Sequence, residues 1–274
     1  MPAFVHPLDL EILLALAWSG PLLTAHLRLL VAPTMDPSGL LKHLRALKAA
    51  HLVDGHLYYQ RRKGEAPKRR GWVWTITPEG FRLLPEDRRK PEAPPALRRA
   101  LLDHDLLVGA FVACVVDQAR PVLSGVQVVH EVRLDAERPR PRCDAIVVLK
   151  RSPHPGLPHV PWQSAPAVAE ETVRGFAVEV DRETEGIGVI RDKAAGYKQV
   201  WGDPSFYRRY GRMPVPLWVV PNRRRLGTIM EAWRAVWPEG RWYMTTDDRL
   251  PALHFDGYAR GEVRPVDLLD GWLR

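Results

Sequence analysis

Cysteine is scarce in this sequence, which holds only Cys114 and Cys143 among its 274 residues. The two form no Cys-x-x-Cys pair and have no regularly spaced histidine neighbours, so neither a disulfide framework nor a structural zinc site is expected. No apolar run approaches the roughly 20 residues of a membrane-spanning helix. The N-terminal apolar stretch contains acids and lacks the basic start of a signal peptide. We therefore expect a cytoplasmic protein that does not enter a membrane.

Two enzyme signatures are also missing, whereas positive charge is abundant. No GxxxxGK[ST] segment is present, so no nucleotide cofactor is expected. No set of serine, histidine and aspartate suggests a hydrolase triad. The chain carries 40 Lys and Arg against 32 Asp and Glu, a formal net charge of +8. Such an excess points to a polyanionic partner, either nucleic acid or a membrane surface.

A proline-rich, charged segment divides the chain. "PEDRRKPEAPPALRRA" (85–100) has no apolar periodicity and is typical of an extended connector. We therefore expect an N-terminal domain over residues 1–84, a linker over 85–99 and a C-terminal domain over 100–274.

Three helices and a hairpin are predicted in the N-terminal domain. Helical apolar spacing appears in "PLDLEILLALAWSG", "LLTAHLRLLV" and "DPSGLLKHLRALKAAHLV". Asp36 suits the N-cap of the third helix and Pro37 its first position. Strands are expected at 57–59 and 72–76, and a closing helix after Thr77. This order is typical of a winged helix, whose third helix enters the major groove while the hairpin contacts phosphates.

Basic side chains follow both of these elements. On the hairpin, six cations stand against one acid, Glu65. A solvated basic loop, or a winged helix that binds another protein, would show the same pattern. We expect double-stranded DNA as the partner, contacted by Lys42, His43, Arg45, Lys48, Arg61, Arg62, Lys63, Lys68, Arg69 and Arg70.

The C-terminal domain alternates between helices and strands. A helix "ALRRALLDHDLLVGAFVACVVDQAR" precedes strands in "VQVVHEVRL", "RCDAIVVLK" and "GFAVEVD". A helix "EGIGVIRDKAAGYKQVW", a strand "VPLWVVP", a helix "LGTIMEAWRAVW" and a last strand "RWYMTTDD" follow. The order α-β-β-β-α-β-α-β predicts a mixed sheet flanked by helices. The expected fold class is α+β, an N-terminal winged helix joined to a C-terminal α/β domain with a mixed central sheet.

Carboxylates gather near one end of this predicted sheet. Residues two apart in a strand share a face, so Glu179 and Asp181 point away from the side occupied by Val178 and Val180. Asp144 lies at the start of the preceding strand. Neighbouring carboxylates raise one another's pKa, and a Mg²⁺ or Mn²⁺ ion held by Asp144, Glu179 and Asp181 would relieve that cost. Such a metal activates water and stabilises charge during phosphodiester cleavage.

A lysine on the following helix completes a candidate catalytic set of Asp144, Glu179 and Lys193. Lys193 shares a helix face with Tyr197, four residues on, and could orient the attacking water or contact the scissile phosphate. A structural alternative remains open. In that case Asp144 begins a turn, Lys193 is an ordinary surface lysine, and the two strand acids pair with arginines, of which the nearby candidates are Arg174, Arg182 and Arg191.

The spacing Asp144 … Glu179-Val180-Asp181 … Lys193 resembles the PD-(D/E)XK nuclease superfamily. That superfamily usually has Glu-x-Lys on the third strand, where this chain has Asp181 in place of the lysine. The proline usual before the first aspartate is Cys143. A lysine displaced to the following helix occurs in some branches, and Lys193 is at that place. The resemblance implies a restriction-endonuclease-like domain and metal-dependent deoxyribonuclease activity.

Most of the chain also resembles the replication-relaxation family of plasmids and other mobile elements. The segments that carry this resemblance are "WTITPEGFRLL", "DHDLLVGAF", "CDAIVVL", "FAVEVDRETE" and "RDKAAGYKQV". It implies DNA-linked work in replication or relaxation, with a homodimer or a replication or transfer protein as further partner.

Two functions follow from these patterns and stay open. The first is a Mg²⁺-dependent endonuclease that nicks or cleaves DNA, favoured by the presence of both Asp144 and Glu179. The second is a non-catalytic DNA-binding regulator of replication or transfer, built on a degenerate nuclease fold and favoured by the displaced lysine and by the unusual Asp181.

Overall fold

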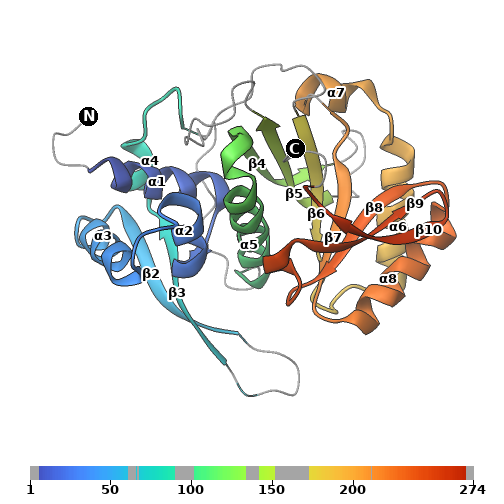
Figure 1. Cartoon of the computed structure of the whole chain (residues 1–274), viewed down its shortest axis with the longest axis horizontal. Helices are drawn as coiled ribbons and strands as arrows, with labels where there is room; N and C mark the ends of the chain where they lie inside the picture. Colours follow the sequence, from blue (N-terminus) through green and yellow to red (C-terminus); the bar gives the residue numbers. More distant parts are fainter. Residues whose placement is uncertain are drawn as a thin grey trace. The chain divides into compact units, whose positions relative to one another are not determined.

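The computed structural model describes residues 6–60, 66, 68–89, 102–133, 142–151, 173–210 and 212–269. Figure 1 labels their helices and strands. By their contacts these residues form two compact units, one up to Gln118 and the other from Ala119 onward. Most of the expected linker, including the domain boundary at 99/100, lies outside the described residues. The helix α5 (Leu102–Ala119), expected in the C-terminal domain, groups with the first unit up to Gln118.

Three helices open the first unit, at the places the sequence predicts: α1 (Pro7–Ser19), α2 (Thr24–Val31) and α3 (Pro37–Ala49). The helix α1 is buried on all sides from Ile12 to Ser19, as expected of a helix that is apolar all round. The helix α3 begins as predicted, because an Asp36 Oδ2 atom accepts a hydrogen bond from the Ser38 amide at 2.9 Å.

A three-stranded antiparallel sheet with the order β1-β3-β2 completes the first unit. It consists of β1 (Leu22–Leu23), β2 (Val53–Gln60) and β3 (Lys68–Ile76), and the short helix α4 (Pro78–Arg82) follows. The strand β2 begins at Val53, earlier than predicted. Asp54 and Gly55 are poor strand formers, so the sequence pattern did not indicate this part of the strand. Thr77 caps α4 as predicted, since its Oγ1 accepts from the Gly80 amide at 3.0 Å. The order of elements is compatible with a winged helix.

The second unit contains a seven-stranded mixed sheet with the order β10-β9-β8-β7-β6-β5-β4, which confirms the predicted α+β fold class. The strands β6, β7 and β8 run parallel, and the other neighbours are antiparallel. The strands are β4 (Leu123–Arg133), β5 (Arg142–Arg151), β6 (Val173–Val180), β7 (Val215–Val220), β8 (Arg241–Thr246), β9 (His254–Ala259) and β10 (Glu262–Asp267).

The prediction that β8 is the last strand was wrong. The chain continues into the hairpin β9–β10, which turns at Arg260 and Gly261, both with positive φ. The strand β10 is an exposed edge strand that contains Pro265, and it therefore lacks the apolar alternation by which strands are recognised.

Two helices, α6 (Ile187–Val200) and α8 (Arg223–Val236), pack together along one face of this sheet (Figure 1). Their core is aromatic: the ring centroid of Trp233 lies 5.6 Å from that of Trp218 and 5.4 Å from that of Trp242. Ala177 of β6 belongs to this core, so the face to which Ala177, Glu179 and Asp181 point is the one covered by α6 and α8.

The remaining elements are short. The helix α7 (Pro204–Tyr210), which the sequence did not predict, precedes β7. Two 3₁₀ turns lie at Arg120–Val122 and Leu250–Ala252. Among the described residues, no helix is both long and apolar enough to cross a membrane.

Candidate functional site

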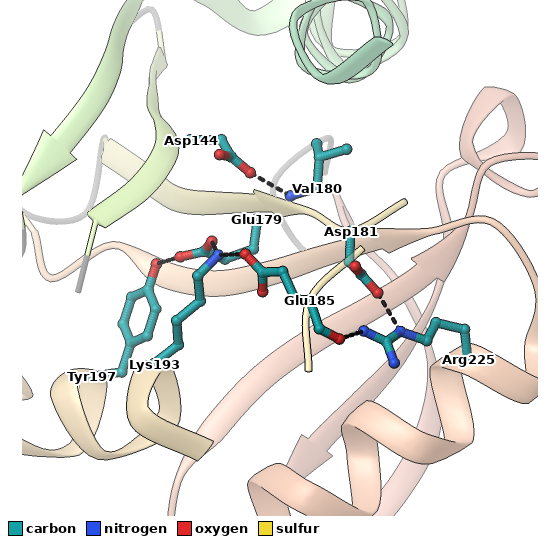
Figure 2. A network of polar contacts seen from close by, with 8 residues as sticks. All are labelled: Asp144, Glu179, Val180, Asp181, Glu185, Lys193, Tyr197 and Arg225. Atoms are coloured by element: carbon teal, nitrogen blue, oxygen red, sulfur yellow. Dashed lines mark hydrogen bonds and ion pairs between the residues drawn. The ribbon is translucent and has the colours of Figure 1, made fainter. Parts of the chain in front are cut away.

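The first candidate site lies in the second unit, where β5 and β6 part. The antiparallel pairing of these strands runs as far as Ala145 opposite Val178. Beyond that pair, Asp144 Oδ2 accepts a hydrogen bond from the Val180 amide at 2.6 Å. A side-chain carboxylate thus binds a main-chain N–H at the end of the ladder and ties the two strand ends together (Figure 2).

Glu179 is fully buried, and protein donors bind both of its carboxylate oxygens (Figure 2). Lys193 Nζ lies 2.8 Å from Glu179 Oε2, and the Tyr197 hydroxyl donates to Glu179 Oε1 at 2.7 Å. Lys193 and Tyr197 therefore share a face of α6, as their spacing predicts. Lys193 Nζ also lies 2.7 Å from Glu185 Oε1, so the ammonium bridges two carboxylates.

Burial and neighbouring charges together set the pKa values of this cluster. It raises the pKa of Glu179 from 4.5 to about 7, although the charge of Lys193 acts in the opposite direction; Asp144 adds to the rise. Burial alone would lower the pKa of Lys193, but the carboxylates of Glu179, Asp144 and Glu185 outweigh it and raise that pKa. Burial and the neighbouring Glu179 raise the pKa of Tyr197 well above its usual value. Near neutral pH, Lys193 is therefore charged, Tyr197 keeps its proton and Glu179 titrates.

Asp181 directly follows β6, two residues after Glu179, but binds a different helix. Its carboxylate accepts from Nε of Arg225, in the first turn of α8, and Figure 2 shows the two side chains directed toward each other. Arg225 Nη2 also donates to the carbonyl oxygen of Glu185 at 2.6 Å. The arginine partner of Asp181 is thus Arg225. Two of the arginines considered from the sequence bind elsewhere. Arg182 Nη1 lies 3.8 Å from Asp247 Oδ2, and Arg174 Nη1 donates to the Leu268 carbonyl oxygen.

The predicted metal ligands are only partly brought together. Both Glu179 oxygens accept from protein donors, and Arg225 binds one oxygen of Asp181; Asp181 Oδ1 is buried and has no hydrogen-bond partner among the described residues. Nowhere in the described ranges do three His, Cys, Asp or Glu side chains gather as metal ligands would. In this arrangement Lys193 and Arg225 supply next to Glu179 and Asp181 the positive charge that a Mg²⁺ or Mn²⁺ ion would otherwise supply.

The second candidate site is the basic surface of the first unit. On α3, Lys42 and Arg45 are exposed. His43 is partly buried, with its Nδ1 atom 2.7 Å from Asp9 Oδ1. Lys48 Nζ donates to the Gly55 carbonyl at 2.7 Å and so links α3 to β2. Lys42, Arg45 and Lys48 are therefore exposed, although Lys48 also holds a contact within the unit, and His43 is partly buried.

We call the β2–β3 pair the basic hairpin. Lys68, Arg69 and Arg70 are exposed at the start of β3, and Arg70 Nε donates to Gln60 Oε1 at 2.7 Å. The pairing shifts register between Tyr58 and Tyr59, which leaves Arg70 as the extra residue of a bulge. The other three predicted contacts, Arg61, Arg62 and Lys63, lie outside the described residues.

Sequence reasoning missed two participants of the carboxylate network, Glu185 and Arg225. Glu185 lies in "RETEG", just before α6. An acid is favourable next to the start of a helix, so its position could have been recognised from the sequence. Arg225 is one of three consecutive arginines in the first turn of α8, an unfavourable place for cations relative to the helix dipole. Cations at this unfavourable place indicate a nearby acidic partner, and this was the signal in the sequence.

The chain matches the model of one protein family, described as replication-relaxation, over residues 16–215. The match takes in the basic hairpin, Asp144, Glu179 and Lys193, and it ends before Arg225. Neither the curated proteins nor the solved structures gave a match. Because the matched region covers well over half of the chain, the protein belongs to the replication-relaxation family, which connects it with DNA-related work on plasmids and other mobile elements.

Proposed function

We propose that this protein binds duplex DNA through its first unit and acts as a non-catalytic regulator of replication or transfer of a mobile element. The observation that carries the proposal is the exposed basic charge on α3 and on the basic hairpin of one compact unit. Family membership supports DNA as the polyanion. The second unit then serves as a platform for a homodimer or for a replication or transfer protein.

The arrangement of α3 supports duplex binding. Lys42 and Arg45 are three residues apart and therefore lie on the same side of the helix. The opposite side, with Leu40, Leu44 and Leu47, is buried in the unit. A third helix with one buried and one basic face is suited to the major groove, and a neighbouring basic hairpin is suited to phosphates.

The internal pairing of the second unit supports the non-catalytic part of the proposal. Phosphodiester hydrolysis by a nuclease of this type needs carboxylates that can bind a metal ion. Here Lys193 and Tyr197 bind both oxygens of Glu179, and Arg225 binds Asp181. Each acid thus has a protein cation beside it, a role that a bound metal ion would take in a nuclease of this type.

Salt-dependent DNA binding tests the duplex interface. In fluorescence anisotropy with a labelled duplex, the double variant Lys42→Ala, Arg45→Ala should bind more weakly. Its log–log salt slope should be shallower by about 2, because each phosphate contact contributes about 0.9. The control is Lys198→Ala, Arg234→Ala, which removes two exposed charges from the second unit. Equal losses in both double variants would mean that only net charge matters, and would contradict the proposed interface.

A second candidate function is a Mg²⁺- or Mn²⁺-dependent endonuclease. The observation that favours it is the grouping of Asp144, Glu179 and Lys193 where β5, β6 and α6 meet. A metal ion at Glu179 would share or compete for the oxygens that Lys193 and Tyr197 bind. A supercoiled-plasmid assay with either metal decides the matter. Nicking or double-strand cleavage that is lost in both Asp144→Ala and Glu179→Ala would establish the endonuclease, whereas DNA binding without cleavage would leave the regulator.

A further inference from the structure

We infer that the basic hairpin binds unpaired DNA by stacking bases on an exposed aromatic surface beside its cations. This inference rests on the proposed DNA-binding function and deepens it, because it names the form of DNA that this surface recognises. We call this surface the stacking face and define it by Leu57, Tyr59, Trp72, Arg69 and Lys48.

The pairing of β2 with β3 places these residues on one side of the hairpin. Leu57 and Tyr59 are two residues apart on β2 and therefore point the same way. Trp72 lies opposite Leu57, and Arg69 lies opposite Tyr59. Directly opposed residues of an antiparallel pair share a face, with Cβ atoms about 5 Å apart. Two aromatic rings, an aliphatic side chain and a guanidinium thus lie on one side of the hairpin.

This surface is open to solvent. Tyr59 is 50% exposed and Leu57 is 42% exposed, and among the described residues of the first unit these are the two exposed large apolar side chains. The neighbouring tyrosine behaves differently. Tyr58 points to the opposite side, where its hydroxyl donates to the Asp103 carboxylate, and it is only partly exposed. One tyrosine of the adjacent pair is thus fixed within the first unit, while the other faces outward.

Cations border the stacking face at both ends. Lys48 Nζ lies 5.5 Å from the centroid of the Trp72 ring, and Arg69 is exposed beside Tyr59. Proteins that hold single strands combine this pair of features, since aromatic rings stack on the bases while basic side chains follow the phosphates. The positive charge of the hairpin also complements the negative charge of DNA, whereas an apolar protein surface would offer it no partner.

An unpaired strand suits this surface better than a duplex. Within a duplex the flat faces of the bases are covered by their neighbours, so that only base edges and phosphates are accessible. Leu57 cannot bind a phosphate and Tyr59 can do so only through its hydroxyl, whereas a base freed from its stack presents a flat apolar face to both side chains. Replication exposes such bases, which is consistent with the family to which the chain belongs.

The test uses the full chain with a labelled thymine homopolymer and a labelled duplex of equal length. Tyr59→Ala should weaken binding of the homopolymer by roughly 5- to 150-fold, the loss typical of one stacked base, and should leave duplex affinity unchanged. Tyr59→Phe should retain homopolymer binding because the ring remains. The matched control is His56→Ala, an exposed residue on the other face of the same strand.

The outcomes separate this inference from the duplex proposal. Unchanged homopolymer affinity in Tyr59→Ala would overturn the stacking face, and so would an equal loss on duplex and homopolymer. If Lys42→Ala, Arg45→Ala left duplex binding intact while Tyr59→Ala selectively lost the homopolymer, the duplex proposal would fail and the stacking face would stand. Circular dichroism of Tyr59→Ala verifies the fold, which a half-exposed side chain should not alter.

Discussion

Replacing Glu179 by glutamine separates the two forces that act on this carboxylate, namely burial and its pairing with Lys193. Burial raises the pKa of Glu179 from 4.5 to about 7. A group whose folded pKa is raised stabilises the fold below its unfolded pKa, and this contribution is lost as the pH rises through the folded pKa. The pH window for Glu179 therefore runs from about 4.5 to about 7.

The size of the effect follows from these two values. One pH unit of difference between folded and unfolded pKa corresponds to about 1.4 kcal/mol, so ionised Glu179 costs on the order of 3 kcal/mol above pH 7. Glutamine has nearly the same shape, still accepts from Tyr197 and never ionises. Glu179→Gln should therefore match the wild type near pH 4.5 and exceed its stability by about 3 kcal/mol at pH 8.

Urea unfolding between pH 4.5 and 8 measures this difference. The buried tryptophans Trp218, Trp233 and Trp242 report on the core that contains Tyr197. If pairing with Lys193 dominated instead, the pKa of Glu179 would lie below its usual value and glutamine would be the less stable variant at pH 8. A difference that stays constant across the pH range, or that changes in this opposite sense, would refute the reasoning.

Two further predictions concern the packing of each unit. Arg225→Met leaves the buried Asp181 carboxylate without its cation, so unfolding should require about 3–5 kcal/mol less; adding Asp181→Leu should recover most of that loss in the same urea titration. Gly55→Ala places a Cβ atom 2.5 Å from the Trp74 ring, and thermal unfolding should show a loss of about 1–3 kcal/mol. The control Gly227→Ala, at an open helical position, should be neutral or slightly stabilising.

Local signals made the helices of the first unit predictable. Asp36 followed by Pro37 marks the start of α3, and Thr77 marks the start of α4, because a side-chain cap acts within three residues of itself. The same locality explains what was missed. The two residues of β1 are too few to show alternation, and β2 was recognised only from Leu57 because Asp54 and Gly55 interrupt its pattern.

The carboxylate network shows where sequence reasoning ends. Alternation along β6 predicts that Glu179 and Asp181 face away from Val178 and Val180, and the two acids do lie on the face covered by α6 and α8. Alternation does not say what meets them there. Lys193 was within reach of prediction because α6 directly follows β6, whereas Arg225 comes 44 residues after Asp181 in the chain and is brought near only by the crossover through β7.

Asp144 performs a task that does not depend on catalysis. Its carboxylate accepts the Val180 amide at the point where the β5–β6 ladder ends, and an amide left without an acceptor there would cost about 1–3 kcal/mol. Moving Oδ2 to an incoming ion would sacrifice that bond. An aspartate at position 144 therefore has a structural reason of its own, the closure of the strand ends, which a scaffold needs as much as a nuclease does.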